Sequence, residues 1–159
     1  MNRRPITWAW YALDDLSARQ LYRIISLRER VFVVEQECVY LDADGLDIDS
    51  CHLCGWDGET VVAYLRLMPP GIKYPEAAIG RVVIAPERRG EGLAKALMRE
   101  AIRESERRFP GVGLKLSGQC YLAGFYSGLG FQSQGESYLE DGIPHIAMIR
   151  CAGAAQSPE

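Results

Sequence analysis

The sequence predicts an α/β fold of three layers, in which a mixed β-sheet lies between helices. Three observations lead to this class. Runs rich in β-branched and aromatic residues alternate with segments whose apolar residues recur at helical spacing. The dipeptides Asp57-Gly58 and Asp141-Gly142 each join two such runs, which is a strong hairpin signal. The resulting order is strand, helix, antiparallel strands, helix, strand, helix and hairpin, as expected for a sheet covered by helices.

The first half of the chain contains one predicted helix and three predicted strands. Residues 6–13 form the first strand. Ser17 and Gln20 have the spacing of a capping box, which opens a helix. The apolar face of this helix carries Leu21, Ile24, Ile25 and Val31. Because a β-branched run follows, the sequence leaves the end of the helix open. Two further strands, residues 51–56 and 59–68, form a hairpin.

The second half begins with a predicted strand over residues 77–85. It leads into a helix from Leu93 to Phe109, which Pro110-Gly111 ends. The other predicted elements are a strand over 113–118, a short helix within 120–131, and a hairpin of strands 137–141 and 145–149. A chain of 159 residues has room for one core, so we expect a single domain over residues 1–150. The small, polar end, residues 151–159, is expected to be a disordered tail.

The composition excludes several classes of partner and location. A formal net charge of -3 lacks the basic field that nucleic acids and anionic membranes require, so we expect neither as the main partner. No apolar run approaches the ~20 residues of a membrane helix. The run from Trp8 to Leu13 is too short for the core of a signal peptide. The sequence therefore predicts a cytoplasmic protein, and it leaves open whether the protein is a monomer or a homodimer.

The five cysteines predict neither a disulfide framework nor a metal site. Their number is odd and no secretion signal precedes them, so we expect reduced thiols. Cys51 and Cys54 form a CxxC pattern, but residues three apart in a strand point to opposite faces of a sheet. Their sulfurs cannot then share an ion, so we expect no metal.

Residues 80–95, GRVVIAPERRGEGLAK, turn from a strand into a helix through two glycines. The stretch fits neither the Walker phosphate loop nor the dinucleotide fingerprint. Gly90 and Gly92 let the backbone approach a ligand, and the free N–H groups and positive dipole end of the helix favour an anion. Arg88 and Arg89 add positive charge. These residues alone leave two interpretations open, an anion site or a glycine-softened helix start with solvated arginines.

The stretch RVVIAPERRGEGLAKALM resembles the acetyl-coenzyme A motif of the GCN5-related N-acetyltransferase (GNAT) family. The family pattern is Arg or Gln, two residues, Gly, one residue, then Gly or Ala, and Arg89, Gly92 and Ala94 fill it. The segment FYSGLGF, residues 125–131, resembles the family's Phe-Tyr-x-x-x-Gly-Phe motif. Residues 27–47, the IGRVVI strand and residues 140–148 are similar to the ElaA-type subgroup, so the resemblance covers nearly the whole chain.

This resemblance implies a fold and a reaction. The fold is a mixed, mostly antiparallel sheet that splays where the coenzyme inserts, with helices on both faces. The reaction is the transfer of an acetyl group from acetyl-coenzyme A, the cosubstrate, to a primary amine by direct attack in a ternary complex. The acceptor would be a small-molecule or peptide amine. The coenzyme-binding residues implied by the family are Val82, Val83, Ile84, Arg89, Gly90, Gly92, Leu93, Ala94 and Gln119.

The resemblance also implies roles in catalysis. Tyr126 matches the family's proton donor to the departing thiolate, and the ordinary tyrosine pKa of ~10 keeps it protonated at neutral pH. The alternative is that Tyr126 is a core aromatic residue. Some relatives carry a glutamate base at the position of Leu114, so this chain has no base there. The candidates left for the base are Glu35, His52 and His145, or a water chain that ends in bulk solvent. Glu35 and His145 are also candidates on the acceptor side, and His145 would suit a proton relay, whereas His52 is expected to be a half-buried strand residue.

A cluster of acidic residues follows the first helix at Asp42, Asp44, Asp47 and Asp49. We expect a solvated acidic loop. A sharper hypothesis is that Asp42 and Asp44, extended by Glu140 and Asp141, form an acidic rim that attracts a cationic amine. The alternative function for the whole chain is a catalytically inactive acyl-coenzyme A-binding module, which would keep the glycine loop without turnover.

Overall fold

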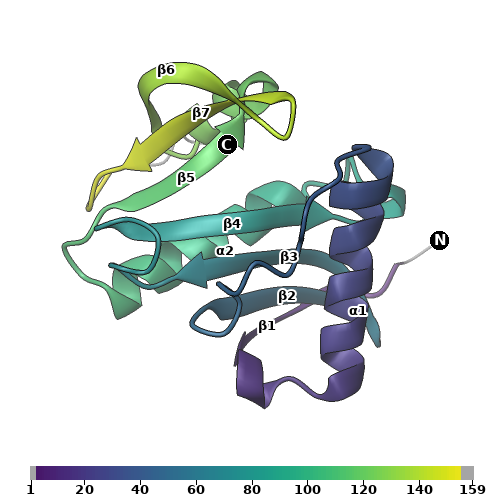
Figure 1. The fold of residues 1–159 in the computed structure, drawn as a ribbon. Helices are drawn as coiled ribbons and strands as arrows, with labels where there is room; N and C mark the ends of the chain where they lie inside the picture. The colour runs from purple at the N-terminus through teal and green to yellow at the C-terminus, as the bar shows by residue number, and fades with distance from the viewer. Residues whose placement is uncertain (1–2, 155–159) are drawn as a thin grey trace.

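The computed structural model describes residues 3–154, which build a mixed sheet of seven strands with helices against it (Figure 1). The strands are β1 (Thr7–Ala12), β2 (Cys51–Asp57), β3 (Thr60–Met68), β4 (Ala77–Ile84), β5 (Leu114–Gln119), β6 (Gln132–Glu140) and β7 (Ile143–Arg150). The helices are α1 (Ala18–Arg28), α2 (Leu93–Arg108) and α3 (Ala123–Ser127). The strand order is β1-β2-β3-β4-β5-β7-β6, in which β4 and β5 pair in parallel and the other neighbours are antiparallel. The predicted α/β class is therefore confirmed.

Helices α1 and α2 cover opposite faces of the sheet (Figure 1). The central strand β3 is buried on both faces, and its side chains alternate between two apolar clusters. Val62 and Tyr64 pack with α1, whereas Leu65 and Leu67 pack with α2. This alternation gives the three layers that the sequence predicts.

Local signals account for the ends of α1. The Ser17 hydroxyl accepts a hydrogen bond from the Gln20 N–H at 3.1 Å, and the Gln20 side-chain oxygen accepts one from the Ser17 N–H at 2.9 Å. This is the predicted capping box. Beyond α1, residues Glu29–Glu35 continue as a wider π-helical segment. The chain thus stays helical through the β-branched run that left the end of the helix open.

The parallel pair β4 and β5 diverges along its length. The two strands are paired at Ala77 with Leu114 and at Ala78 with Lys115. From there β4 follows β3 as far as Ile84, and β5 follows β7 as far as Gln119. Figure 1 shows the two strands meeting at one end and separating at the other. The splay implied by the family resemblance is therefore present.

The predicted hairpin at Asp141-Gly142 is present, but β6 is longer than the sequence indicates. Both turn residues have positive φ values, 51° and 77°, as a two-residue hairpin requires. β6 starts at Gln132 instead of residue 137. It is exposed along its whole length, so it lacks the alternation of buried and exposed residues that reveals a strand. Of the predicted tail, residues 155–159 lie outside the described part of the chain.

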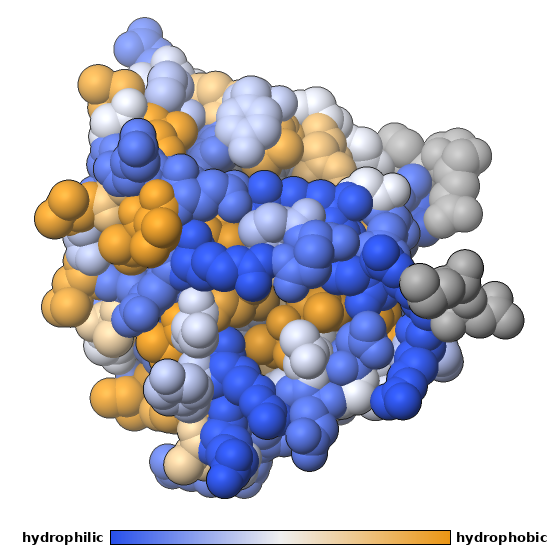
Figure 2. Space-filling model, turned by 90° about the vertical axis from the view of Figure 1, so that its right-hand side faces the viewer, coloured by the Kyte–Doolittle hydropathy of each residue, from blue (hydrophilic) through white to orange (hydrophobic). Residues whose placement is uncertain are grey.

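Cys51 and Cys54 point to opposite faces of β2, as predicted. Cys51 packs against the cluster under α2, and Cys54 belongs to the cluster under α1. Residues 3–154 contain no group of three His, Cys, Asp or Glu side chains placed to hold a metal ion. Within the same range, every helix is too short or too polar to cross a membrane. Figure 2 shows a face on which hydrophilic side chains predominate, with apolar side chains along its left edge and in the gaps between the hydrophilic ridges.

Candidate active site

A cleft of about 710 Å³ lies where β4 and β5 diverge. Its wall includes residues of β4, β5, α3, the turn between β6 and β7, and the segment that follows α1. The predicted site residues on this wall are Val82, Val83, Ile84, Arg89, Ala94, Gln119, Tyr126, Glu35 and His145. Gly90, Gly92 and Leu93 are not part of the wall, although the neighbouring Arg89 and Ala94 are. The structure thus gathers residues far apart in the sequence around one cleft.

The glycine loop before α2 leaves its backbone open to a ligand. Gly90 and Gly92 have left-handed φ values of 80° and 79°. A Cβ atom built on either glycine would meet no heavy atom within 4 Å. Gly92 is the N-cap residue of α2, so no side chain caps the first N–H groups of this 16-residue helix. Free donors and the positive end of the helix dipole suit an anion such as a pyrophosphate.

The two arginines of this loop have different surroundings. Arg88 is buried, and its guanidinium lies 2.8 Å from Asp57 and 2.8 Å from Glu91, so it ties the loop to the hairpin of β2 and β3. Arg89 is half exposed and contacts Glu35 at 2.8 Å. Glu35, predicted on the acceptor side, is therefore the partner of the coenzyme-loop arginine. An exposed ion pair of this kind is worth roughly 0–1 kcal/mol, so an anionic ligand can replace Glu35.

Tyr126 presents a buried phenol to the cleft. Its ring packs edge-on against Phe125 and Phe131, with ring centroids 5.2 Å and 6.1 Å away. Burial raises the pKa of Tyr126 to about 12, so it remains protonated at neutral pH. Within residues 3–154 its hydroxyl has no hydrogen-bond partner. The hydroxyl oxygen is not among the fully buried polar atoms, and Tyr126 lines the cleft, so this donor is available to a molecule there.

Gly118 in β5 makes room for the Tyr126 ring. A Cβ atom at Gly118 would lie 2.9 Å from Cε2 of Tyr126, which is closer than two non-bonded carbon atoms approach one another. Glycine is thus required for the ring to lie directly on the strand. An isolated glycine in a strand is a known sign of such close approach, and this signal in the sequence LKLSGQ could have identified the position.

A β-bulge shapes the β4 wall of the cleft. Tyr64 of β3 lies opposite Val83, and Arg66 lies opposite Gly80, so two residues of β4, Arg81 and Val82, face one residue of β3. Arg81 has a φ of 54°, which is strained for a residue with a side chain. Bulges bend a strand and redirect its groups. This one lies directly before Val83 and Ile84, which the family resemblance places beside the coenzyme.

The Arg81 side chain holds the bulge against the segment that follows α1. Its Nε donates a hydrogen bond to Oδ1 of Asp42 at 2.9 Å. Its Nη2 donates to the backbone carbonyl of Asp42 at 3.0 Å and lies 3.3 Å from Asp44. These contacts anchor a backbone conformation that β4 would not adopt unaided.

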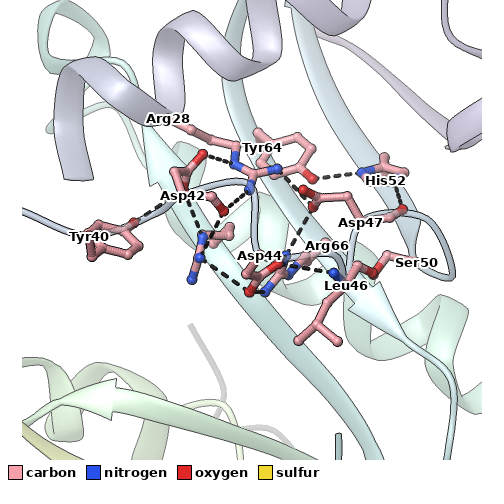
Figure 3. A network of polar contacts seen from close by, with 11 residues as sticks. Arg28, Tyr40, Asp42, Asp44, Leu46, Asp47, Ser50, His52, Tyr64 and Arg66 are labelled. Atoms are coloured by element: carbon pink, nitrogen blue, oxygen red, sulfur yellow. Dashed lines mark hydrogen bonds and ion pairs between the residues drawn. The ribbon is translucent and has the colours of Figure 1, made fainter. Parts of the chain in front are cut away.

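Arg81 contacts Asp42 and Asp44, which belong to a largely buried ionic network. Figure 3 labels the other members of this network. The network joins the arginines Arg28, Arg66 and Arg81 with the aspartates Asp42, Asp44 and Asp47. Arg28 contacts Asp42 at 2.9 Å and Asp47 at 2.8 Å. Arg66 contacts Asp44 at 2.7 Å and Asp47 at 3.0 Å. Both of these arginines have only 1% of their surface exposed, so their charges depend on the aspartates.

The expectation of a solvated acidic loop is therefore wrong for Asp42, which is buried, and for Asp47, whose side chain is 13% exposed, whereas Asp44 is exposed but paired with arginines. Burial alone raises the pKa of Asp44 and of Asp47, but hydrogen bonds and charges from the arginines outweigh it. The pKa of each carboxyl is consequently well below its usual range. The acidic rim for a cationic amine stays a prediction: Asp42 lies off the cleft wall, and Asp44 lies on it but is paired with arginines. Asp49 is exposed, as expected.

His52 supports this network and is more buried than predicted. Its Nδ1 lies 2.7 Å from the Tyr64 hydroxyl, and its Nε2 lies 2.9 Å from the backbone carbonyl of Asp47. Burial lowers the pKa of His52, so the ring is neutral near pH 7. His52 thus fixes the loop that carries Asp47 and lies outside the cleft wall.

The strain at the bulge can be measured by two substitutions. Arg81→Ala is expected to be less stable than Arg81→Gly by about 1 kcal/mol, because alanine is strained at a left-handed φ and glycine is not. Both variants lose the contacts to Asp42, so their difference reports the backbone alone. Urea denaturation measures it. Equal stabilities, or a more stable alanine variant, would show that Arg81 is not held in a strained conformation.

The other half of the cleft, called the acceptor half below, contains polar groups that lie outside the coenzyme motifs. Its wall includes Lys73, Ser117, Glu140 and His145. The Cys38 thiol lies 3.5 Å from the Asp141 carbonyl and joins the segment after α1 to the β6–β7 turn. Leu114, the position of a glutamate in some relatives, is buried and lies off the cleft wall. A base for this site must therefore come from elsewhere.

Comparisons with known proteins agree with this geometry. A family model described as an acetyltransferase (GNAT) domain matches residues 46–151. The chain is 42% identical to a UPF0039 protein of Synechocystis over 91% of this chain and 94% of that protein. It is 39% identical to protein ElaA of Escherichia coli over 91% of this chain and 96% of that protein.

Solved structures give the same result. The structure of an acyl-CoA N-acyltransferase from Pseudomonas aeruginosa matches with a TM-score of 0.88 and 41% identity, over 92% of this chain and 99% of that one. The structure of Escherichia coli ElaA matches with a TM-score of 0.86 and 38% identity, over 91% and 99% of the two chains. The splayed sheet, the glycine loop and these matches together show that the chain belongs to the GNAT acetyltransferase family, in the subgroup of ElaA and the UPF0039 proteins.

Proposed function

We propose that this protein transfers an acetyl group from acetyl-coenzyme A to a primary amine by direct attack in a ternary complex. The observation that carries the proposal is the hydroxyl of Tyr126 in the cleft between β4 and β5, which has no hydrogen-bond partner among residues 3–154. A protonated phenol at this place can donate a proton to a departing thiolate. The glycine loop before α2 supplies the anion site that the coenzyme's pyrophosphate needs.

The residues divide into two groups along the cleft. On the coenzyme side, Arg89 and the loop amides from Gly90 to Ala94 would hold the pyrophosphate, and Val82, Val83 and Ile84 would lie beside the pantetheine. Gln119, at the end of β5, would contact the coenzyme where relatives have an asparagine. Leu93 opens α2 and would contribute its amide. On the acceptor side, His145 would face the amine, which is a small molecule or a peptide.

A backbone N–H of the splayed strand would stabilise the transition state. β4 pairs with β5 only at its first two residues within the described structure, so beyond Ala78 its edge toward β5 has donors without a strand partner. Donors fixed in this way favour the negative charge that develops on the thioester carbonyl oxygen. The bulge at Arg81 would aim the amide of Val83 or Ile84, because it changes the direction of the strand just before them.

The remaining features follow from the same proposal. Residues 1–150 would act as one acetyltransferase domain, followed by a tail over 151–159. The protein would work in the cytoplasm as a monomer or homodimer, where acetyl-coenzyme A and amines are both present. It needs no metal, since the proposed chemistry uses a proton donor, a proton acceptor and a backbone N–H.

Isothermal titration with acetyl-coenzyme A tests the coenzyme site. The native protein is expected to bind, and the double variant Gly90→Glu, Gly92→Glu is expected to lose at least tenfold in affinity, because two carboxylates would occupy the anion site. Gly111→Glu is the matched control: Gly111 has a φ of 77° and open space, but it lies after α2. Native protein that binds no acetyl-coenzyme A would reject the proposed function. An equal loss of affinity in Gly111→Glu would show that backbone strain at a left-handed glycine weakens binding, and not a change in the coenzyme loop.

A turnover assay distinguishes the proposed enzyme from the alternative, an inactive acyl-coenzyme A-binding module. Free thiol released from acetyl-coenzyme A can be followed in the presence of a peptide amino terminus, a lysine derivative, a polyamine and n-butylamine. Acetylated product with any of them supports the enzyme. Tight coenzyme binding with no product and no thiol release would favour the module.

A further inference from the structure

The hairpin of β6 and β7 places a histidine and a carboxylate together in the acceptor half of the cleft. Tyr138 and His145 lie directly opposite each other, and Glu140 lies two residues beyond Tyr138 on the same face of β6. Nε2 of His145 is 3.3 Å from Oε2 of Glu140. Both residues line the cleft. The coenzyme motifs do not include either of them.

The surroundings of His145 fix which ring nitrogen carries the proton. Nδ1 lies 2.7 Å from the backbone carbonyl of Ile143. A carbonyl oxygen only accepts hydrogen bonds, so Nδ1 carries a proton. The Tyr138 ring stacks on the imidazole at 6.3 Å between centroids and keeps its plane. Nε2 is then the ring nitrogen that can exchange a proton with a molecule in the cleft, and the Glu140 carboxylate 3.3 Å away stabilises the ring once Nε2 is protonated.

We infer that His145, paired with Glu140, is the proton acceptor for the amine in the proposed acetyl transfer. The inference rests on the proposed function and assigns the base that the site otherwise lacks. His145 is 8% exposed and its position is fixed, whereas the Glu140 side chain is 45% exposed and reaches solvent. A proton can therefore pass from the cleft to His145, then to Glu140, and from there to water.

The proton balance of the reaction is complete with these groups. An alkylammonium ion gives one proton to Nε2 of His145, and Glu140 stabilises the resulting imidazolium. The neutral amine then attacks the thioester carbonyl carbon, so that a C–N bond forms and the C–S bond breaks. Tyr126 gives its proton to the departing thiolate, and the tyrosinate takes the second nitrogen proton from the product. The net reaction releases one proton, which leaves through Glu140.

Glu140 is also positioned for this role. The Ser117 hydroxyl lies 3.4 Å from Oε2 of Glu140 and forms a close hydrogen bond with the Tyr138 hydroxyl. Ser117 lies on β5, which pairs with β7 on the side of His145 opposite to β6. The neighbouring strands thus hold the carboxylate beside the imidazole. The same arrangement selects an acceptor that arrives as a cationic primary amine, because an ammonium ion can donate to both groups.

The tautomer of His145 tests the inference on the native protein alone. The chain has two histidines, and the structure requires opposite tautomers for them. His145 should be protonated on Nδ1, whereas His52 should be protonated on Nε2, which faces the Asp47 carbonyl at 2.9 Å. Long-range ¹H–¹⁵N correlation spectra above pH 8 distinguish the two forms, and the variant His145→Asn assigns the signals. An Nε2-protonated His145 would overturn the inference, whether or not an acceptor is known.

Turnover of acetyl-coenzyme A with n-butylamine tests the catalytic step. His145→Asn keeps a side-chain donor for the Ile143 carbonyl but lacks a base, so the rate near pH 7 is expected to fall by about 10²-fold or more. The deficit should shrink as the pH rises and the amine loses its proton unaided. Acetyl-coenzyme A affinity should stay unchanged. Added imidazole should restore part of the rate to His145→Ala.

Two further variants test whether the loss of rate is specific to the pair of His145 and Glu140. Glu140→Gln is expected to lower the rate by about tenfold, whereas Glu136→Gln, at an exposed position of the same strand, should leave it unchanged. The other ionisable groups on the acceptor half of the wall are Tyr40, Asp44, Lys73, Arg81 and Asp141. A His145→Asn variant with the native rate and pH profile would overturn the inference and leave the acetyl transfer intact. Failure of the native protein to bind acetyl-coenzyme A would instead reject the proposed function.

Discussion

Replacing Asp42 by alanine is expected to lower the free energy of unfolding by about 3–5 kcal/mol, because it removes one partner from a buried ionic network. The Asp42 carboxylate contacts Arg28 and Arg81, each at 2.9 Å, and the Tyr40 hydroxyl at 3.2 Å. Arg28 is 1% exposed, so without Asp42 its charge keeps Asp47 as its one ionic partner within residues 3–154. Urea denaturation monitored by circular dichroism measures the loss.

Asp49→Ala is the matched control for this substitution. Asp49 belongs to the same segment but is exposed, so its removal should change stability by less than about 0.5 kcal/mol. If Asp42→Ala unfolds the protein, Asp42→Asn provides the milder test, because it keeps the shape and loses the charge. A loss below about 1 kcal/mol for Asp42→Ala would contradict the view that the network is a buried ionic core.

Tyr126→Phe is expected to lower kcat for amine acetylation by about 10²–10⁴-fold, the usual range for loss of a general acid. The affinity for acetyl-coenzyme A should stay within a factor of about three, because the ring and its packing against Phe125 and Phe131 are retained. The loss should appear in kcat because the proton is transferred only as the thiolate leaves. Steady-state kinetics and isothermal titration measure the two quantities.

Tyr121→Phe is the control for the tyrosine substitution. Tyr121 also lines the cleft, but it is exposed, so loss of its hydroxyl should change kcat by less than about threefold. A Tyr126→Phe variant with native kcat would return Tyr126 to the role of a core aromatic residue. A variant that loses coenzyme affinity instead of kcat would make the hydroxyl a binding group.

The sequence predicts the fold and the coenzyme side of the cleft well because both depend on local patterns. Hydrophobic periodicity and turn dipeptides give the order of elements, and the strand-glycine-helix stretch gives the anion site. Gly90 and Gly92 adopt the left-handed backbone that glycine permits at low cost. The sequence does not indicate the start of β6, because the side chains of this strand are exposed on both faces and leave no periodic signal.

The acceptor half could not be predicted in the same way, because its residues act through partners far away in the sequence. Asp42, Asp44 and Asp47 appear as an acidic run, yet their partners are arginines on α1, β3 and β4. Arg81 gives no local sign of its left-handed backbone, since Asp42 holds it there. Glu35 lies close in sequence to the acceptor segment, but it contacts Arg89 of the coenzyme loop.

A crystal structure of the protein with acetyl-coenzyme A tests the central claim most directly. We expect the pantetheine to lie between β4 and β5, the pyrophosphate to contact the amides from Gly90 to Ala94, and the thioester sulfur to lie within hydrogen-bond reach of the Tyr126 hydroxyl. Arg89 should have exchanged Glu35 for a phosphate oxygen. Coenzyme bound outside the splay, or a sulfur remote from Tyr126, would contradict the proposed acetyltransferase site.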